Sequence, residues 1–299
     1  MLLANYLRQC GVDLDLQSVI LRIAQGSVEL CSRVDNNAAV TVGEENLSGD
    51  EQIKLDVLAD AIFTGVLQGE KVVYALVSEE KDDQELVNEE GRFTVAFDPL
   101  DGSSLVAANF SVGSIFAIYE AKGAIGVTGA DLAAGIYCLY GPKTMLVFAI
   151  GDKIASFTMH KGEYYLEKND LRIADTTKYF APGNLKAVNY NLNYGKLVDY
   201  WISHDYKLRY SGGMVPDIHH MLYKGDGVFA YPGMTDQPNG KLRLLYECIP
   251  MAKIVEAAGG FSTDGEQSIL TKKVESLHQR TTFCVGSKAE VDRYIELQV

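Results

Sequence analysis

The sequence predicts a protein of the α/β (α+β) class, because helical patterns come first, strand patterns fill the middle, and the two alternate afterwards. Apolar residues recur at helical spacing from Leu16 to Leu30 and again from Leu58 to Gly65, which indicates two amphipathic helices. Short apolar runs separated by glycine, aspartate and lysine turns predict strands at residues 72–77, 93–97, 114–119, 135–140, 145–150, 154–160 and 164–167. Strands this close together favour a largely mixed or antiparallel sheet.

A turn signal at Pro182, Gly183 and Asn184 predicts a division into two lobes, residues 1–182 and residues 183–299. Beyond it we expect a strand near Ala187, helices near residues 196–203, 216–223 and 250–258, and a strand at residues 228–231.

Composition and charge exclude several classes of protein. The 299 residues carry 40 acidic and 27 basic side chains, a formal charge of -13, so no broad positive surface is available for a nucleic acid or an anionic membrane. The apolar runs are far shorter than the roughly 20 residues that cross a bilayer. The five cysteines form no CxxC pair, and the N-terminus has neither a signal nor a transit pattern. We therefore expect a cytoplasmic protein, or a plastid protein if a transit peptide has been removed.

The strongest local signal is the run Phe97-Asp98-Pro99-Leu100-Asp101-Gly102-Ser103-Ser104. Pro99 keeps Asp98 extended and fixes the turn, so that Asp98 and Asp101 can converge on a hard cation. The small residues that follow leave backbone amides free, which is what a phosphate oxygen needs. The alternative is an ordinary turn with surface aspartates.

Further carboxylates lie elsewhere in the chain. Glu79 and Glu80 come just after the predicted strand at residues 72–77, and Glu247 follows a mixed apolar and basic run. If this strand and the strand before Asp98 end at one sheet edge, the carboxylates surround a small volume and repel one another unless cations fill it. Oxygen ligands without histidine favour Mg²⁺ or Mn²⁺ over zinc. Taken alone, Glu79 and Glu80 begin an acidic run typical of a solvated face, and Glu247 suits a helix N-terminus.

Polar and aromatic side chains in the second half form a donor set suited to a second phosphate away from the carboxylates. The set is Asn191, Tyr194, Arg209, Tyr210, Tyr231, Lys241 and Arg243. Gly212 and Gly213 would let the backbone approach a ligand closely. The tyrosines can equally well pack in a core.

Together these motifs resemble the class I sugar bisphosphatases, the family of fructose-1,6-bisphosphatase and sedoheptulose-1,7-bisphosphatase. The resemblance runs from about Leu47 to the C-terminus, through residues 49–56, 79–80, 97–104, 209–217 and 241–250. It implies the layered sugar-phosphatase fold of the fructose-1,6-bisphosphatase and inositol monophosphatase type. The N-terminal lobe would then bind metal, and the C-terminal lobe would bind substrate.

The same resemblance implies a Mg²⁺-dependent hydrolase, with Mn²⁺ as the alternative, acting on a ketose bisphosphate. The metal ligands would be Asp50, Glu79, Glu80, Asp98, Asp101, Glu247 and the Leu100 carbonyl, with Asp50, Asp56 and Glu80 as catalytic residues. The substrate would be held by Asp101, Gly102, Ser103, Ser104, Asn191, Tyr194, Arg209, Tyr210, Gly212, Gly213, Met214, Tyr231, Lys241 and Arg243. In the fructose enzymes the residue at Arg209 reaches across a subunit interface, so a homodimer or homotetramer is implied.

Within the family, the sequence resembles the branch that acts on the seven-carbon sugar. Gly213 stands where the fructose enzymes usually have serine, Pro216 is absent from them, and residues 277–280 also resemble this branch. We therefore expect hydrolysis of the 1-phosphate of sedoheptulose 1,7-bisphosphate, with fructose-1,6-bisphosphatase or activity on both sugars as the alternative. The run that binds the inhibitor AMP in many fructose enzymes is missing, and Phe93 replaces its tyrosine, so we expect no AMP inhibition.

Two other classes remain open. An inositol or nucleotide phosphatase shares the carboxylates but has no reason for the distal set. A non-catalytic cation-binding protein has no need of Asp56, Ser103 and Lys241 beside the metal ligands.

Overall fold

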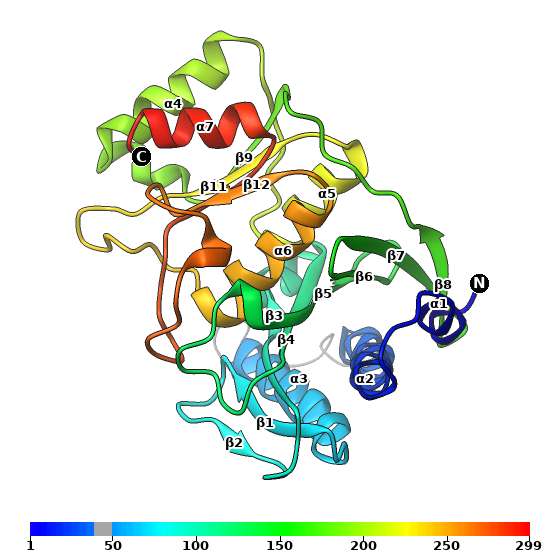
Figure 1. The fold of residues 1–299 in the computed structure, drawn as a ribbon. Coiled ribbons are helices and arrows are strands. Elements are labelled where there is room, and N and C mark those ends of the chain that lie inside the picture. Colours follow the sequence, from blue (N-terminus) through cyan, green and yellow to red (C-terminus); the bar gives the residue numbers. More distant parts are fainter. Residues whose placement is uncertain (39–49) are drawn as a thin grey trace.

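The computed structural model describes residues 1–38 and 50–299, with side chains described outside residues 34–54. It shows a layered α/β fold built on two sheets (Figure 1), which confirms the predicted fold class. Within the described ranges, no helix is both long enough and apolar enough to pass through a membrane.

The larger sheet has the strand order β2-β1-β3-β4-β5-β6-β7-β8. Its strands are β1 (Val73–Ser78), β2 (Glu85–Leu86), β3 (Phe93–Asp101), β4 (Val112–Tyr119), β5 (Leu132–Tyr140), β6 (Met145–Ile150), β7 (Lys153–His160) and β8 (Glu163–Lys168). Neighbouring strands are antiparallel except for β1 and β3, which run parallel. β1 and β3 therefore end at the same edge, where Ser78 pairs with Phe97, as the carboxylate hypothesis required.

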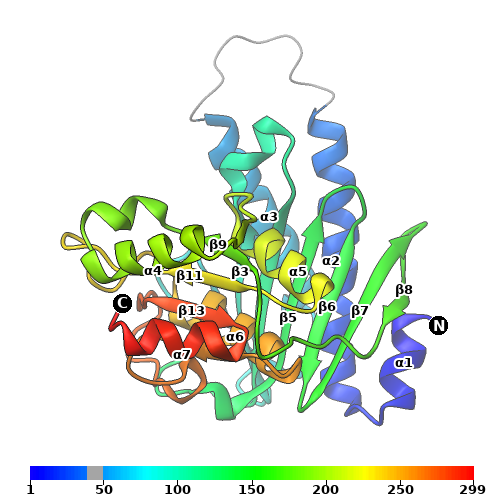
Figure 2. The same ribbon diagram turned by 90° about the horizontal axis from the view of Figure 1, so that it is seen from above.

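Three helices, α1 (Leu3–Gln9), α2 (Leu14–Ala38) and α3 (Asp50–Gln68), cover one face of this sheet. Figure 2 shows α2 and α3 side by side along it. Their apolar faces match the two helical patterns of the sequence, and Phe63 of α3 packs edge-on against Phe116 with ring centres 4.7 Å apart. The seven residues of α1 are too few to give a recognisable period.

The second sheet has the order β10-β9-β11-β13-β12 and lies beyond a middle layer of helices. Its strands are β9 (Tyr179–Pro182), β10 (Lys207–Leu208), β11 (Val228–Tyr231), β12 (Phe261–Thr263) and β13 (Phe283–Gly286). The middle layer contains α5 (Met214–Lys224) and α6 (Ile249–Ala257), while α4 (Leu192–Ser203) and α7 (Lys288–Glu296) pack on the outer face. The layers thus alternate helix, sheet, helix, sheet, helix.

The expected strand near Ala187 is wrong, because these residues form the short 3₁₀ helix η3 (Leu185–Asn189). The segment between β9 and the cap of α4 at Asn191 does not pair with a strand. It closes local bonds instead, with the Ala187 amide donating to the Asn184 carbonyl. The division at residues 182 and 183 remains a prediction. β9, which ends at Pro182, pairs with β11 in the second sheet.

Candidate functional site

Two carboxylates of one turn meet a third from far along the chain beside the edge where β1 and β3 end. Asp98, Asp101 and Glu247 each offer an oxygen, and these oxygens lie within 4.8 Å of one another. Asp98 is 4% exposed and Glu247 is 6% exposed, so little water can screen their charges. Such a group of oxygen ligands has the chemistry of a divalent cation site.

The turn that carries two of these carboxylates is held from several sides. The Asp98 Oδ1 accepts a hydrogen bond from the Leu100 amide at 2.9 Å, and the Pro99 carbonyl accepts one from Ser114 Oγ at 2.7 Å. The register between β3 and β4 shifts between Asp98 and Asp101, so the turn bulges away from the ladder. These contacts give the turn the convergence that its sequence predicted.

Asp101 is fixed by the start of α5. Its Oδ2 accepts a hydrogen bond from the Val215 amide at 2.8 Å. The helix comes this close because Gly113, on the neighbouring strand β4, has no side chain: a Cβ there would lie 2.4 Å from Val215 Cγ1. Gly113 had no recognisable signal in the sequence, because its role depends on a contact with residues far along the chain.

Glu247 lies on a single π-helical turn, η4 (Leu244–Cys248), which runs directly into α6. Its Oε2 accepts a hydrogen bond from the Arg243 amide at 2.6 Å, and the Leu245 carbonyl accepts one from Tyr119 at 2.7 Å. π-turns are rare and occur frequently at functional sites, because they re-aim a side chain out of the regular helix.

Glu79 and Glu80 follow β1 directly. The Glu79 amide donates to the Phe97 carbonyl at 3.0 Å, which holds it beside the Asp98 turn. Arg243 Nε lies 3.7 Å from Glu79 Oε1. Arg243, predicted to bind substrate, therefore also offsets some of the negative charge of the cluster.

Burial and mutual repulsion disfavour the ionised carboxylates. Burial raises the pKa of Asp101 to about 6, and burial with the nearby Glu80 charge raises that of Asp56 to about 6. Burial raises the pKa of Glu79 to about 7 although Arg243 opposes the shift. Burial first, and then Glu79, raise the pKa values of Asp98 and Glu247 well above their usual range. A bound divalent cation would remove this repulsion.

The predicted phosphate side of the site adjoins this cluster. Gly102 takes a φ of 81°, and Ser103 and Ser104 then begin the short 3₁₀ helix η1 (Ser103–Ala108). The hydroxyl of Ser103 hydrogen-bonds to Asp56, whose Oδ1 is buried with no partner among the described residues. This oxygen is available to a further ligand, such as a water molecule or a cation. The side chain of Asp50 lies outside the described residues.

The predicted distal set is brought together only in part. Tyr210 lies within electrostatic reach of both Tyr194 and Tyr231. Tyr194 is fully buried against Trp201, and its hydroxyl has no partner within the described part of the chain. Asn191 uses its Oδ1 to accept from the Tyr194 amide, so the residue caps α4.

Two other residues of the predicted set are exposed. Arg209 is exposed, donates to its own Leu208 carbonyl and lies over the Tyr179 ring. Lys241 is exposed as well. Met214 is 4% exposed and packs in the core between the sheets, so only its backbone remains available beside Gly212 and Gly213.

Asp217 is a site neighbour that sequence reasoning did not single out. Its Oδ1 accepts a hydrogen bond from the Ser211 amide at 2.7 Å and so holds the glycine loop before α5. The only signal for it was an acidic residue in the first turn of a predicted helix.

We expect the metal-free protein to lose stability as the pH rises. Asp101 and Glu79 change from ordinary values of 3.8 and 4.5 to pKa values of about 6 and about 7 in the folded state. Between about pH 4 and pH 7 the folded state therefore binds more protons than the unfolded state, so the free energy of unfolding falls with rising pH. In EDTA the Tm should be higher at pH 5 than at about pH 8, and Mg²⁺ should restore most of the difference at the higher pH.

The matched comparison is Asp101→Asn, which removes one of the repelling charges and should reduce the pH-dependent loss in EDTA. A wild-type Tm that is the same at both pH values would contradict the close approach of the carboxylates.

Comparison with known proteins identifies relatives over nearly the whole chain. The family models described as "Fructose-1-6-bisphosphatase, N-terminal domain" and "Fructose-1-6-bisphosphatase, C-terminal domain" match residues 13–169 and 173–299. A class 1 fructose-1,6-bisphosphatase from Geobacter metallireducens is 40% identical over 297 residues, which cover 98% of this chain and 94% of the relative. One from Campylobacter hominis is 40% identical over 254 residues, which cover 85% and 89%.

Solved structures show the same fold. Leishmania major fructose-1,6-bisphosphatase in its holo form superposes with a TM-score of 0.92 at 30% identity, covering 100% of this chain and 98% of the other. A Toxoplasma gondii protein with the provisional assignment sedoheptulose-1,7 bisphosphatase gives a TM-score of 0.90 at 31% identity, with the same coverage.

Proposed function

We propose that this chain, which belongs to the fructose-1,6-bisphosphatase family of phosphoric monoester hydrolases acting on sugar bisphosphates, hydrolyses the 1-phosphate of fructose 1,6-bisphosphate with Mg²⁺. The observation that carries the proposal is the meeting of Asp98, Asp101 and Glu247 with oxygens within 4.8 Å of one another. We expect the reaction to take place in the cytoplasm.

In this proposal the cation is held by Asp98, Asp101, Glu247, Glu79 and the Leu100 carbonyl. Mg²⁺, or Mn²⁺ in its place, supplies positive charge that stabilises the phosphoryl oxygens and the leaving oxygen. Asp56 and Glu80 would orient the attacking water and accept its proton. The amides of Ser103 and Ser104 hold the 1-phosphate.

The choice of the six-carbon sugar differs from the expectation raised by the motifs. The relatives at 40% identity are named as fructose-1,6-bisphosphatases. In fold, the Toxoplasma gondii structure assigned to the seven-carbon enzyme resembles this chain about as closely as the Leishmania major fructose enzyme does, with TM-scores of 0.90 and 0.92. The resemblance to the seven-carbon branch rests partly on Gly213, which stands where the fructose enzymes usually have serine. A Cβ at this position would lie 3.2 Å from Pro216 Cδ and 3.4 Å from Leu105 Cδ1. The glycine therefore makes room for the proline ring. This contact supports the view that Gly213 and Pro216 occur together because of packing and not because of substrate choice.

Direct assay should give a higher kcat/KM for fructose bisphosphate than for sedoheptulose bisphosphate, with activity on both. One added carbon and hydroxyl changes the discrimination by only about 1–3 kcal/mol. Gly213→Ser should lower the Tm, because the serine meets Pro216, and should leave the ratio of the two kcat/KM values nearly unchanged. Inositol phosphate and a nucleotide are the comparison substrates.

The double variant Gly213→Ser with Pro216→Ala should recover the Tm. A preference for the seven-carbon sugar would instead support the second candidate function, sedoheptulose-1,7-bisphosphatase. A preference for inositol phosphate or the nucleotide would reject both.

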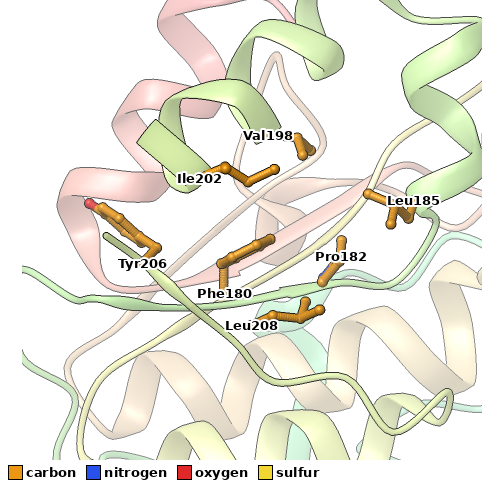
Figure 3. Close-up of a pocket in the computed structure, with 7 residues that line it drawn as sticks. All are labelled: Phe180, Pro182, Leu185, Val198, Ile202, Tyr206 and Leu208. Atoms are coloured by element: carbon orange, nitrogen blue, oxygen red, sulfur yellow. The ribbon is translucent and has the colours of Figure 1, made fainter. Parts of the chain in front are cut away.

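The substrate proposal includes assembly into a homodimer or homotetramer. An apolar cavity of about 220 Å³ opens at the edge of the second sheet (Figure 3), with side chains from β9, α4 and β10 pointing into it. Its lining residues are Phe180, Pro182, Leu185, Val198, Ile202, Tyr206 and Leu208. Arg209 follows Leu208 directly in the chain and is exposed. A second copy covering the groove would bury the apolar rim and bring Arg209 to the partner's distal phosphate.

Charge placed in this groove should weaken the assembly. Ile202 is 66% exposed, and Ile202→Glu should shift the measured mass toward the monomer and raise KM for the bisphosphate. Leu14→Glu, at a residue that is 74% exposed on α2, is the matched control and should change neither. Mass photometry over a dilution series measures the effect. An unchanged mass for Ile202→Glu would separate the groove from the assembly.

A further inference from the structure

His278 bridges two segments that carry carboxylates of the site. It lies in the loop before β13 and is partly buried. Its Nδ1 is 2.8 Å from the Tyr246 hydroxyl, and its Nε2 is 3.0 Å from the Lys81 carbonyl. Neither contact is part of the carboxylate cluster itself.

In the neutral ring, the two contacts fix the position of the imidazole proton. A carbonyl oxygen can only accept, so Nε2 carries the hydrogen that is donated to Lys81. Nδ1 of the same neutral ring is then an acceptor, and the Tyr246 hydroxyl donates to it. One tautomer therefore satisfies both partners at once, and no water needs to intervene.

The partners stand next to carboxylates of the proposed site. Lys81 follows Glu79 and Glu80, and Tyr246, which is fully buried, precedes Glu247 on the π-turn. The loop that carries His278 is itself anchored, since the Leu244 amide donates to the Gln279 carbonyl at 2.8 Å. The ring thus ties the end of β1 to the π-turn through a fixed support.

We propose that His278 is a positioning residue, which holds the segment of residues 79–81 and the Glu247 turn at the separation that a divalent cation requires. The inference rests on the proposed cation site. Glu79 and Glu247 repel each other, as the causes of the raised Glu247 pKa show, so the two segments would tend to separate without a link. Groups that orient metal ligands typically change metal affinity or activity by about 10- to 100-fold when removed.

Three substitutions separate the two hydrogen bonds. His278→Ala removes both. His278→Gln keeps a donor with enough reach for the Lys81 carbonyl, and His278→Asn keeps a polar group near the Nδ1 position but falls short of Lys81. Because only the Gln side chain still reaches the segment of residues 79–81, the Gln variant should recover more of the function than the Asn variant.

His219 provides the matched control. Its Nδ1 also lies 2.8 Å from a tyrosine hydroxyl, that of Tyr137, and its ring stacks on Tyr223 in the middle layer. His219→Ala removes a comparable histidine–tyrosine pair from a position that carries no carboxylate of the site. It should lower the Tm at least as much as His278→Ala does.

The test measures Mn²⁺ binding without turnover, from the EPR signal of free Mn²⁺, together with kcat, KM and Tm. His278→Ala should weaken Mn²⁺ binding by about tenfold or more and lower kcat more than it raises KM, while His219→Ala stays within about twofold of wild type in Mn²⁺ affinity. Wild-type affinity in His278→Ala, or equal weakening in His219→Ala, would overturn the inference. If the alanine variant does not fold, equal Mn²⁺ binding by the Gln and Asn variants overturns it.

Mn²⁺ binding and activity of the wild-type protein distinguish a failure of this inference from a failure of the proposed function. Absence of Mn²⁺ binding or of sugar bisphosphatase activity in the wild type would reject the proposed function itself. Normal wild-type binding with unaffected His278 variants would reject only the positioning role.

Discussion

Asp101→Asn should nearly abolish hydrolysis of the sugar bisphosphate while leaving the fold intact. Asparagine keeps the shape of the side chain, and its Oδ1 can still accept the hydrogen bond from the Val215 amide. What is lost is a negative charge in a buried cluster that is proposed to hold the cation. Loss of one such electrostatic group typically costs about 3 kcal/mol or more in the transition state, which is at least a hundredfold in kcat.

The control for this variant is Glu290→Gln, because Glu290 is also a buried carboxylate, 1% exposed, and lies on α7 away from the site. It accepts hydrogen bonds from Trp201 and Tyr206, so its replacement should affect Tm rather than kcat. The Tm of Asp101→Asn in EDTA should equal or exceed that of wild type, since the variant has less repulsion. A folded Asp101→Asn variant with half the wild-type kcat would remove Asp101 from the catalytic site.

Gly113→Ala should both destabilise the protein and impair the reaction. The added Cβ would lie 2.4 Å from Val215 Cγ1 and 2.5 Å from Val215 Cβ, so the first turn of α5 must move away from β4. Overpacking of this kind typically costs about 1–3 kcal/mol, and we expect the upper end because the contact is with a helix start rather than a flexible tip. The movement also breaks the hydrogen bond from the Val215 amide to Asp101, so kcat should fall by about tenfold or more.

Gly65→Ala is the opposite case on the same scaffold. A Cβ at Gly65 meets nothing within 4 Å, and alanine in a helix interior is favoured over glycine by about 1 kcal/mol. This variant should keep or raise the Tm with an unchanged kcat. Thermal denaturation and initial rates of both variants test the pair, and a Gly113→Ala variant as stable and active as Gly65→Ala would show that α5 does not need the glycine.

Much of the carboxylate site could be predicted from local sequence. The run from Asp98 to Asp101 contains its own turn chemistry, since Pro99 fixes the backbone and Gly102 adopts the positive φ that follows. The pairing of this turn with Glu79 needed one further condition, the parallel alignment of β1 and β3, and the structure meets it. Local signals work here because Glu79 directly follows β1, and Asp98 and Asp101 lie at the end of β3.

The remainder depended on contacts that no local pattern contains. Tyr194 and Tyr231 look alike in the sequence, yet the first is fully buried in the core of the second sheet and the second is partly exposed. The π-turn at Glu247 has no sequence signature of its own. The strand expected near Ala187 is wrong because these residues form a 3₁₀ helix just ahead of the cap at Asn191.

The layered arrangement also determines when the cation site can exist during synthesis of the chain. β1 and β3 belong to the first sheet, whereas Glu247 enters from the middle helical layer, which needs the second sheet to cover its other side. Domains generally begin to fold in order as the chain leaves the ribosome. A nascent chain that has formed only the first sheet therefore holds Glu79, Asp98 and Asp101 together without the carboxylate that closes the group. Cation binding is expected to be a late event, and a ribosome-bound chain stopped before the π-turn should gain no protection from proteolysis when Mg²⁺ is added.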